Sequence, residues 1–148
     1  MASSVFLSPG VLLALFLGAP VAAQCTTVWS PGEGLPGLDH DVFAIVHWDP
    51  DGAGPAPVQI VCGGVFANAG TTPVNHIAAW DPATSTWSDL GGGVNGFVGA
   101  LAVLPNGDLL AGGSFTTAGG VAVANVARWN GSSWSPLGAG CNGGVGVF

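Results

Sequence analysis

The residues with the clearest potential for chemistry are Asp39, His40 and Asp41, which stand just before an apolar run that begins at Val42. Carboxylate oxygens gathered in one turn are ligands that calcium binds in proteins. Aspartates in a turn also accept hydrogen bonds from their own backbone when no ion is present. We favour this second interpretation and predict a solvated turn, in which Asp39 and Asp41 are the residues that a metal would use.

A second acidic pair, Asp49 and Asp51, belongs to the segment Asp-Pro-Asp-Gly. This segment lacks the further acids and the closing glutamate of an EF-hand calcium loop. Asp49–Pro57 is also longer than the corresponding turn later in the chain. We therefore predict an adaptable surface loop rather than a metal site, and such loops commonly carry binding residues.

The three histidines, His40, His47 and His76, do not recur at matching positions, so they predict no array of metal ligands. His47 lies within an apolar run, which indicates a packed or hydrogen-bonded side chain rather than a ligand. His76 matches Asn125 when the two repeats described below are aligned. Both residues could make a side-chain hydrogen bond to the backbone at the start of a strand.

The sequence shows no arrangement typical of catalysis. It has no nucleophile elbow, and its glycine-rich segments precede loops and strands rather than a helix, so they form no phosphate-binding loop. We predict no catalytic residue and no cofactor. The chain contains one basic residue, Arg128, against eight acidic residues. Because so few cations cannot neutralise a phosphate backbone, nucleic acid is excluded as a partner.

The elements that carry these residues occur in two copies. The segment Gly112–Phe115 stands 49 residues after Gly63–Phe66, and Trp134 stands 47 residues after Trp87. The difference of two residues arises in the turn before the second tryptophan of each copy. Turns tolerate changes in length that strands do not, so this pattern predicts two copies of one structural unit.

Each copy has the pattern of four short strands. In the second copy, Pro105–Asp108 contains Asn-Gly and predicts a tight turn between the first two strands. Ser114–Ala124 is expected to be a loose connection anchored by Phe115. No window of the chain after residue 23 has apolar residues at helical spacing. The four strands expected in the second copy are Val98–Leu104, Leu109–Ala111, Asn125–Trp129 and Trp134–Leu137.

Glycines and aromatic residues at matching positions are expected to shape both copies. Paired glycines let two backbones approach closely, and tryptophans in register indicate packing positions. Trp48 has no tryptophan counterpart; it could stack on a sugar, but we favour a position in the core or at its rim. Cys62 matches Ala111, which predicts a small buried side chain. The predicted structural residues are Gly63, Gly64, Phe66, Trp80, Trp87, Gly112, Gly113, Phe115, Trp129 and Trp134.

Paired glycines, a tryptophan sixteen residues after the second glycine (Gly64 to Trp80) and the segment Asp81–Trp87 resemble the kelch repeat. Two segments, Ala111–Gly120 and Asn125–Gly138, are more similar still to the glycine-rich, kelch-like repeats of secreted bacterial proteins, within the galactose-oxidase superfamily of β-propellers. The resemblance implies an all-β fold of four-stranded antiparallel propeller blades. About two and a half blades fit into the chain, which predicts an incomplete, open β-propeller. The copper oxidases of this superfamily use tyrosine ligands, and the chain contains no tyrosine.

The N-terminal residues 1–23 are expected to be a signal peptide, because Val11–Leu17 is a short apolar run followed by small residues before Gln24. Lipidation at Cys25 is an alternative, for which glutamine is a poor preceding residue. The order expected after residue 23 is an N-terminal closing strand (Trp29-Ser30-Pro31) and lead-in at 24–41, blades at 42–96 and 97–143, and the start of a further blade at 144–148, where Val145–Phe148 begins its first strand.

Signal cleavage would place the chain outside the cell or in the periplasm, with no membrane span left. Cys25 and Cys141 could form a disulfide in such an oxidising compartment. The edges of an incomplete propeller could also pair with another chain, so self-association is one expected outcome.

These observations predict a non-catalytic binding or cell-surface scaffold module. Its loops between strands, such as Asp49–Pro57 and Ser114–Ala124, would contact a protein or glycan that the sequence does not identify. The alternative is that the chain is a truncated part of a larger extracellular enzyme, for example one acting on glycans, and supplies its non-catalytic propeller portion.

Overall fold

A computed structural model describes residues 37–148 of the chain, all of which belong to one compact unit. The predicted signal peptide (1–23), the Trp29 closing strand and Cys25 lie outside the described residues.

Residues 37–148 form twelve β-strands and no helix, so none of their segments is a helix able to cross a membrane. The predicted all-β class is therefore confirmed. Short strands separated by glycine, proline and asparagine are what this composition favours, because these residues supply the turn conformations that strands lack. The strands are β1 (Val42–Trp48), β2 (Gln59–Gly64), β3 (Asn68–Ala69), β4 (Thr72–Pro73), β5 (Ile77–Asp81), β6 (Thr86–Asp89), β7 (Phe97–Val103), β8 (Leu109–Ser114), β9 (Thr117–Ala118), β10 (Val121–Ala122), β11 (Val126–Trp129) and β12 (Trp134–Pro136).

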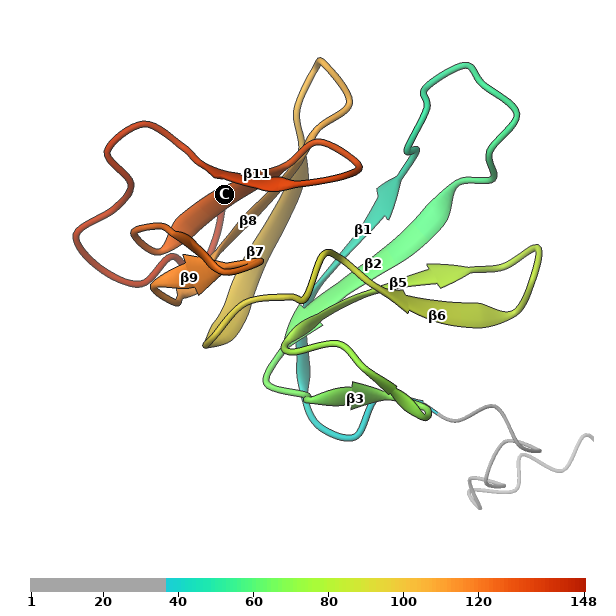
Figure 1. The fold of residues 1–148 in the computed structure, drawn as a ribbon, viewed down its shortest axis with the longest axis horizontal. Coiled ribbons are helices and arrows are strands. Elements are labelled where there is room, and N and C mark those ends of the chain that lie inside the picture. Colours follow the sequence, from blue (N-terminus) through green and yellow to red (C-terminus); the bar gives the residue numbers. More distant parts are fainter. Residues whose placement is uncertain (1–36) are drawn as a thin grey trace, which may run out of the picture. The chain divides into compact units, whose positions relative to one another are not determined.

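The longer strands build two four-stranded antiparallel sheets with the same order (Figure 1). The N-terminal sheet has the order β1-β2-β5-β6 and the C-terminal sheet has the order β7-β8-β11-β12. In both sheets the register shifts near the start of the first strand, between Val42 and Ala44 and between Val98 and Ala100. None of the sheets closes on itself, so each leaves edge strands with free backbone groups.

The tight turn predicted at Pro105–Asp108 is confirmed. The Leu104 N–H donates to Asp108 O at 2.8 Å and the Gly107 N–H donates to Leu104 O at 2.9 Å. Gly107 has φ of 87°, a conformation that glycine adopts without steric cost. Asn-Gly therefore reverses the chain between β7 and β8, whereas residues 49–58 make the same connection in the N-terminal sheet with a longer loop.

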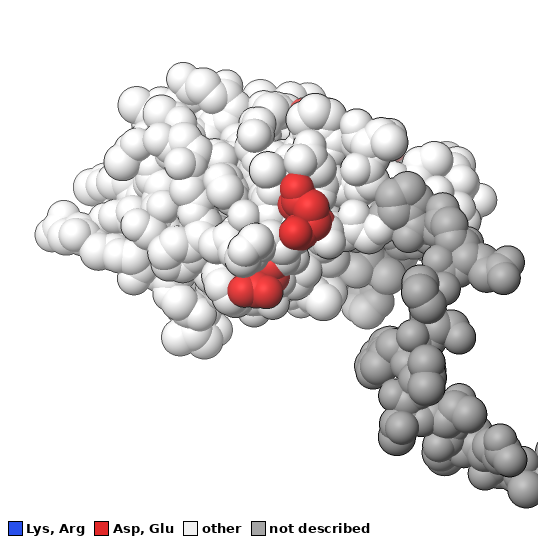
Figure 2. Space-filling model, turned by 90° about the horizontal axis from the view of Figure 1, so that it is seen from below, with Lys and Arg blue, Asp and Glu red and all other residues white. Residues whose placement is uncertain are grey.

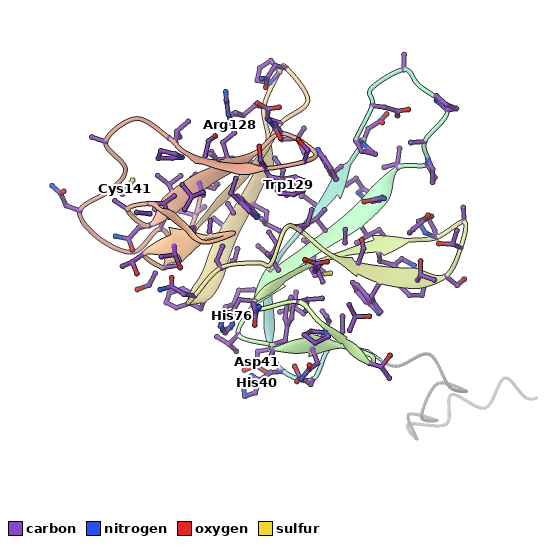
Figure 3. The ribbon with its side chains drawn as sticks, viewed as in Figure 1. His40, Asp41, His76, Arg128, Trp129 and Cys141 are labelled. Carbon is purple, nitrogen blue, oxygen red and sulfur yellow. The ribbon has the colours of Figure 1, made fainter. Side chains whose placement is uncertain are left out.

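The main core lies between the two sheets. Val61 and Ala79 of the N-terminal sheet pack in one cluster with Leu109, Ala111 and Trp129 of the C-terminal sheet, and Trp129 points into the space between them (Figure 3). This burial of apolar surface is the main favourable term that holds the sheets together.

Gly63 shows how close this packing is. A Cβ added to Gly63 would lie 2.5 Å from Val98 Cγ1 and 3.4 Å from Leu101 Cδ1, so any larger residue would push β7 away from the N-terminal sheet. Gly63 therefore lets the backbone of β2 approach the Val98 and Leu101 side chains of β7 closely, as predicted for the paired glycines.

The predicted tryptophan positions match in geometry but differ in burial. The Trp80 and Trp87 rings have centroids 5.1 Å apart, and the Trp129 and Trp134 rings have centroids 5.3 Å apart. Trp129 and Trp134 are buried between the sheets, with 6% and 5% exposure, whereas Trp80 and Trp87 are partly exposed. The repeat therefore predicts the ring pairs but not which sheet packs over them.

Two expectations about the connecting segments are wrong. Ser114–Ala124 is not a loose connection, because β9 and β10 pair within it as a two-stranded ribbon, as β3 and β4 do in the N-terminal half. Val145–Phe148 does not form a strand. The Val145 N–H donates to Gly113 O at 2.8 Å, but a strand needs a continuing ladder of such bonds.

A pair of substitutions separates packing from hydrogen bonding in the core. The Trp134 Nε1–H donates to Leu90 O at 2.6 Å, whereas the buried Trp129 Nε1 has no hydrogen-bond partner. Trp134→Phe leaves the Leu90 carbonyl without its donor and is expected to cost about 1–3 kcal/mol more than Trp129→Phe. Urea unfolding of both variants, followed by circular dichroism, measures the difference. Equal loss of stability in the two variants would contradict this assignment.

Candidate functional site

Loops from both sheets meet at one end of the fold. The loop 49–58 between β1 and β2, the turn between β7 and β8 and the turn after β11 enclose a hollow of about 470 Å³. This hollow, called the loop hollow below, is lined by Asp49, Pro50, Asp51, Gly52, Pro105, Asn106, Gly107, Asp108 and Asn130.

The one basic residue of the chain lies beside the loop hollow. The Arg128 Nε atom is 3.3 Å from Asp108 Oδ2, and Asn106 Nδ2 donates to the same carboxylate oxygen at 2.8 Å. The Asp108 side chain is 14% exposed and the Arg128 side chain 42% exposed. The ion pair fixes the wall of the hollow, and the lining offers carboxylates, side-chain amides and backbone groups for hydrogen bonding.

Asp49 and Asp51 hold the long loop in shape. Asp51 Oδ2 accepts a hydrogen bond from the Ala56 N–H at 3.0 Å, and Asp49 Oδ1 accepts one from the Asp51 N–H at 3.3 Å. In the part of the chain that the structure describes, no three His, Cys, Asp or Glu side chains are grouped so as to hold a metal ion. The aspartates thus make the backbone hydrogen bonds expected of a structured turn.

Asp39 and Asp41 do not belong to the loop hollow. In Figure 3 the neighbouring His40 and Asp41 lie at the lower end of the fold, and Arg128 lies at the upper end. His40 and Asp41 are exposed, with 3.6 Å between His40 Nδ1 and Asp41 Oδ2. Figure 2, viewed from below, shows acidic side chains in separate patches on a face that is otherwise uncharged where it is described. The four aspartates singled out in the sequence therefore divide between two ends of the structure.

Asp39 binds the β3–β4 ribbon. Its Oδ1 accepts hydrogen bonds from the N–H groups of Ala67 and Asn68 at 2.9 and 3.1 Å, and its Oδ2 accepts one from Asn68 Nδ2 at 2.8 Å. The backbone and side-chain hydrogen bonds from Asn68 are the main reasons why the pKa of Asp39 lies below its ordinary value of 3.8.

Asn95 makes the corresponding contacts in the C-terminal half. Its Oδ1 accepts hydrogen bonds from the N–H groups of Thr116 and Thr117 at 2.8 and 2.9 Å. Asp39 stands three residues before Val42, and Asn95 stands three residues before Val98. This spacing was the signal that could have identified Asp39 as a structural residue, but it is visible only when the segments before the two repeats are aligned as well.

Two expectations about histidines are wrong. His47 is exposed, because it lies on edge strand β1 with its side chain on the same open face as Ile45. The Asn125 Nδ2 donates to Cys141 O at 2.9 Å as expected, but His76 Nδ1 is buried without a hydrogen-bond partner. What His76 and Asn125 share is a positive φ, of 71° and 62°.

Trp48 is part of the core, as favoured from the sequence. It is 4% exposed, and its Nε1–H donates to Gly107 O at 2.8 Å. This bond ties the end of β1 to the turn between β7 and β8, so Trp48 supports the loop hollow from beneath and presents no ring face to a ligand.

The two cysteines in the described range have different surroundings. Cys62 is buried as predicted, and burial raises the pKa of its thiol above the ordinary 9.0. Cys141 is an exposed free thiol, and its candidate partner Cys25 lies outside the described residues.

A comparison of the chain with protein-family models, with curated proteins and with solved structures finds no significant match.

Asp39 is expected to make stability depend on acid pH. Its hydrogen bonds favour the charged carboxylate, so its stabilisation is present above the ordinary pKa of 3.8 and is lost as the pH falls through the lower pKa of the folded state. Asp39→Asn, which copies Asn95, is expected to fold and to lose less stability than the wild type on acidification. Urea unfolding midpoints at pH 6 and pH 3 test this, with Asp41→Asn as the control for net charge. Equal acid sensitivity of Asp39→Asn and the wild type would contradict the role of Asp39.

Burial is expected to protect Cys62 from reagents. A maleimide at neutral pH should label Cys141 rapidly and should label Cys62 only after unfolding, because a buried thiol with a raised pKa forms little accessible thiolate. Mass spectrometry of peptides from native and denatured samples measures both sites. Labelling of native Cys62 at the rate of Cys141 would show that its strand opens freely.

Proposed function

We propose that this chain is a secreted segment of kelch-like β-propeller repeats that acts as a non-catalytic binding or cell-surface scaffold module. The observation that carries the proposal is that two successive four-stranded sheets share strand order, the position of a register shift and the contacts of Asp39 and Asn95. Sheets that repeat in this way and pack face to face are consistent with successive propeller blades.

The loop hollow is the proposed contact surface for a protein or glycan. The β1–β2 connection differs most between the two halves, with residues 49–58 in place of the short Asn-Gly turn. Differences in loops on a conserved scaffold are a common source of binding specificity. The long loop contributes Asp49 and Asp51 to the lining, beside Asn106 and Asn130.

The chemistry of the loop hollow favours neutral hydroxyl-rich or cationic ligands over polyanions. Carboxylates and amide oxygens accept hydrogen bonds from hydroxyl and amine groups, and the net charge of −7 at pH 7 repels sulfated or phosphorylated chains. Asp49 and Asp51 are already engaged by backbone N–H groups. This supports a role in holding a surface in place rather than a role in proton transfer.

A loop exchange tests the proposal. Replacing residues 49–58 with Pro-Asn-Gly, which joins Leu104 to Asp108 in the C-terminal sheet as residues 49–58 join Trp48 to Gln59, is expected to leave the fold intact and to abolish binding to a panel of immobilised neutral, cationic and sulfated oligosaccharides and extracellular-matrix proteins. The matched control replaces residues 82–86 with Gly-Ser-Ser, which shortens a turn outside the loop hollow. The proposal fails if the exchanged chain keeps the binding profile of the wild type. It also fails if the wild type hydrolyses or oxidises these sugars and loses that activity on Asp39→Asn or Asp41→Asn.

A further inference from the structure

An asparagine followed directly by glycine can react with its own main chain. Glycine has no side chain, so its backbone nitrogen can come close to the Cγ atom of the preceding asparagine. The chain has four such pairs: Asn95-Gly96, Asn106-Gly107, Asn130-Gly131 and Asn142-Gly143.

The reaction needs only water. The glycine nitrogen bonds to Cγ, the Cγ–Nδ2 bond breaks, and the glycine N–H proton leaves with Nδ2 as ammonia. Water then adds its hydroxyl to one carbonyl carbon of the succinimide ring and returns its proton to the nitrogen. Breaking the new bond to Cγ gives aspartate, whereas breaking the original peptide bond gives isoaspartate, in which the main chain runs through the side-chain carbon.

Hydrogen bonds oppose this reaction at Asn106. Its Nδ2 donates to Asp108 Oδ2 at 2.8 Å, and its Oδ1 accepts a hydrogen bond from the Asp108 N–H at 3.3 Å. The Gly107 N–H donates to Leu104 O at 2.9 Å. Both the attacking nitrogen and the amide that it would attack are therefore held in place.

The side chains of Asn95 and Asn130 are held in a similar way. Asn95 Oδ1 accepts the two backbone hydrogen bonds described above, and its Nδ2 donates to Thr116 Oγ1 at 2.9 Å. Asn130 Oδ1 accepts hydrogen bonds from the N–H groups of Ser132 and Ser133 at 3.0 and 2.8 Å. Each amide must lose these bonds before its Cγ can turn toward the following nitrogen.

Asn142-Gly143 differs from the other three pairs. Within residues 37–148, neither the Asn142 side chain nor the Gly143 N–H makes a hydrogen bond. A Cβ built on Gly143 would meet no atom within 4 Å, so no neighbour obstructs the approach of the two reacting atoms. All four asparagines are exposed, so access of water does not separate them. Hydrogen bonding does.

We infer that Asn142 is a self-modifying site, which converts spontaneously to aspartate and isoaspartate in the folded protein while the other three asparagines persist. The two asparagines that line the loop hollow, Asn106 and Asn130, thus keep their amides. The chemistry takes place outside that hollow and does not depend on a ligand there.

The modification changes a position that repeats along the chain. Asn142 stands three residues before Val145, the spacing at which Asp39 and Asn95 precede the valines of β1 and β7. Conversion to aspartate places the residue type of Asp39 there and adds a negative charge. Conversion to isoaspartate also lengthens the main chain by one atom, between the Cys141 and Val145 N–H groups that bond to the C-terminal sheet and its connecting segment.

Peptide mapping of the purified chain after incubation at mildly alkaline pH tests the inference. Tandem mass spectrometry locates the exchange of amide for carboxyl at each asparagine, and electron-transfer fragmentation distinguishes isoaspartate from aspartate. Asn142 is expected to convert roughly tenfold faster or more than the other three, because at least two hydrogen bonds hold each of their side chains. In urea, where these bonds are lost, all four are expected to convert at similar rates.

A pair of variants tests the chemistry at the site itself. Gly143→Val crowds the attacking nitrogen with a β-branched side chain and is expected to slow conversion of Asn142 roughly tenfold or more. The matched control is Gly146→Val, which also lies in open space but does not follow an asparagine, and it is expected to leave the rate unchanged.

Three outcomes would overturn the inference. In the first, the four asparagines convert at equal rates in the folded protein. In the second, Asn142 converts in urea but not in the folded protein. In the third, Asn142 keeps its lead over the others in urea, because local sequence rather than hydrogen bonding would then set the rates.

Discussion

The packing of one sheet on the next depends on a glycine that leaves room for an indole. At Gly91 the backbone takes a left-handed turn, and the Trp129 ring occupies the space that a side chain would need. The adjacent carbonyl of Leu90 then meets the Trp134 Nε1–H. The Trp129 ring packs on Gly91, and the Trp134 Nε1–H bonds to the neighbouring residue Leu90. Apolar burial and hydrogen bonding therefore hold the linker between the sheets in the same position. The position of the second sheet, and with it the loop hollow, follows from this contact.

The same close packing explains how the fold can be stable with so few charged residues. The described residues contain no buried charged side chain, and the ion pair of Arg128 with Asp108 involves partly exposed groups. Stability must come from close apolar contact and from backbone hydrogen bonds. The core between the sheets combines aliphatic side chains with tryptophan rings, and glycines such as Gly63 and Gly91 bring the backbones together. Rigid packing of this kind leaves the loops as the part of the surface that can vary.

The four longer strands of each half could be predicted from local pattern, because glycine, proline and asparagine mark the ends of apolar runs, and their antiparallel arrangement was implied by the kelch resemblance. The Asn-Gly turn before Asp108 and the burial of Cys62 and Trp48 were predictable in the same way. What could not be predicted depends on neighbours distant in sequence. The exposure of His47 follows from the position of β1 at an edge, and the β9–β10 ribbon needs the Asn95 side chain to hold its first residues.

The candidate site was predicted only in part. The long loop at Asp49 was recognised, but Asp108 and Asn130, which complete the lining of its hollow, have no unusual spacing in the sequence. Asp108 and Asn130 line the loop hollow because the two turns of the C-terminal sheet that contain them lie beside the loop 49–58. Asp39 attracted attention as an acidic residue, yet its function in the fold is shared with an uncharged asparagine. An acidic side chain suggested a metal ligand, whereas the structure shows that Asp39 accepts hydrogen bonds from backbone N–H groups of the β3–β4 ribbon.

The place of Arg128 has a consequence for proteolysis. It is the only lysine or arginine in the chain, so the peptide bond after Arg128 is the only one that a trypsin-like protease can cleave. Arg128 lies in β11, paired with Leu110 of β8 on one side and Ser135 of β12 on the other. A protease needs an extended, unpaired segment, so cleavage requires β11 to leave its sheet. The rate of tryptic digestion of this protein therefore reports the opening of its C-terminal sheet.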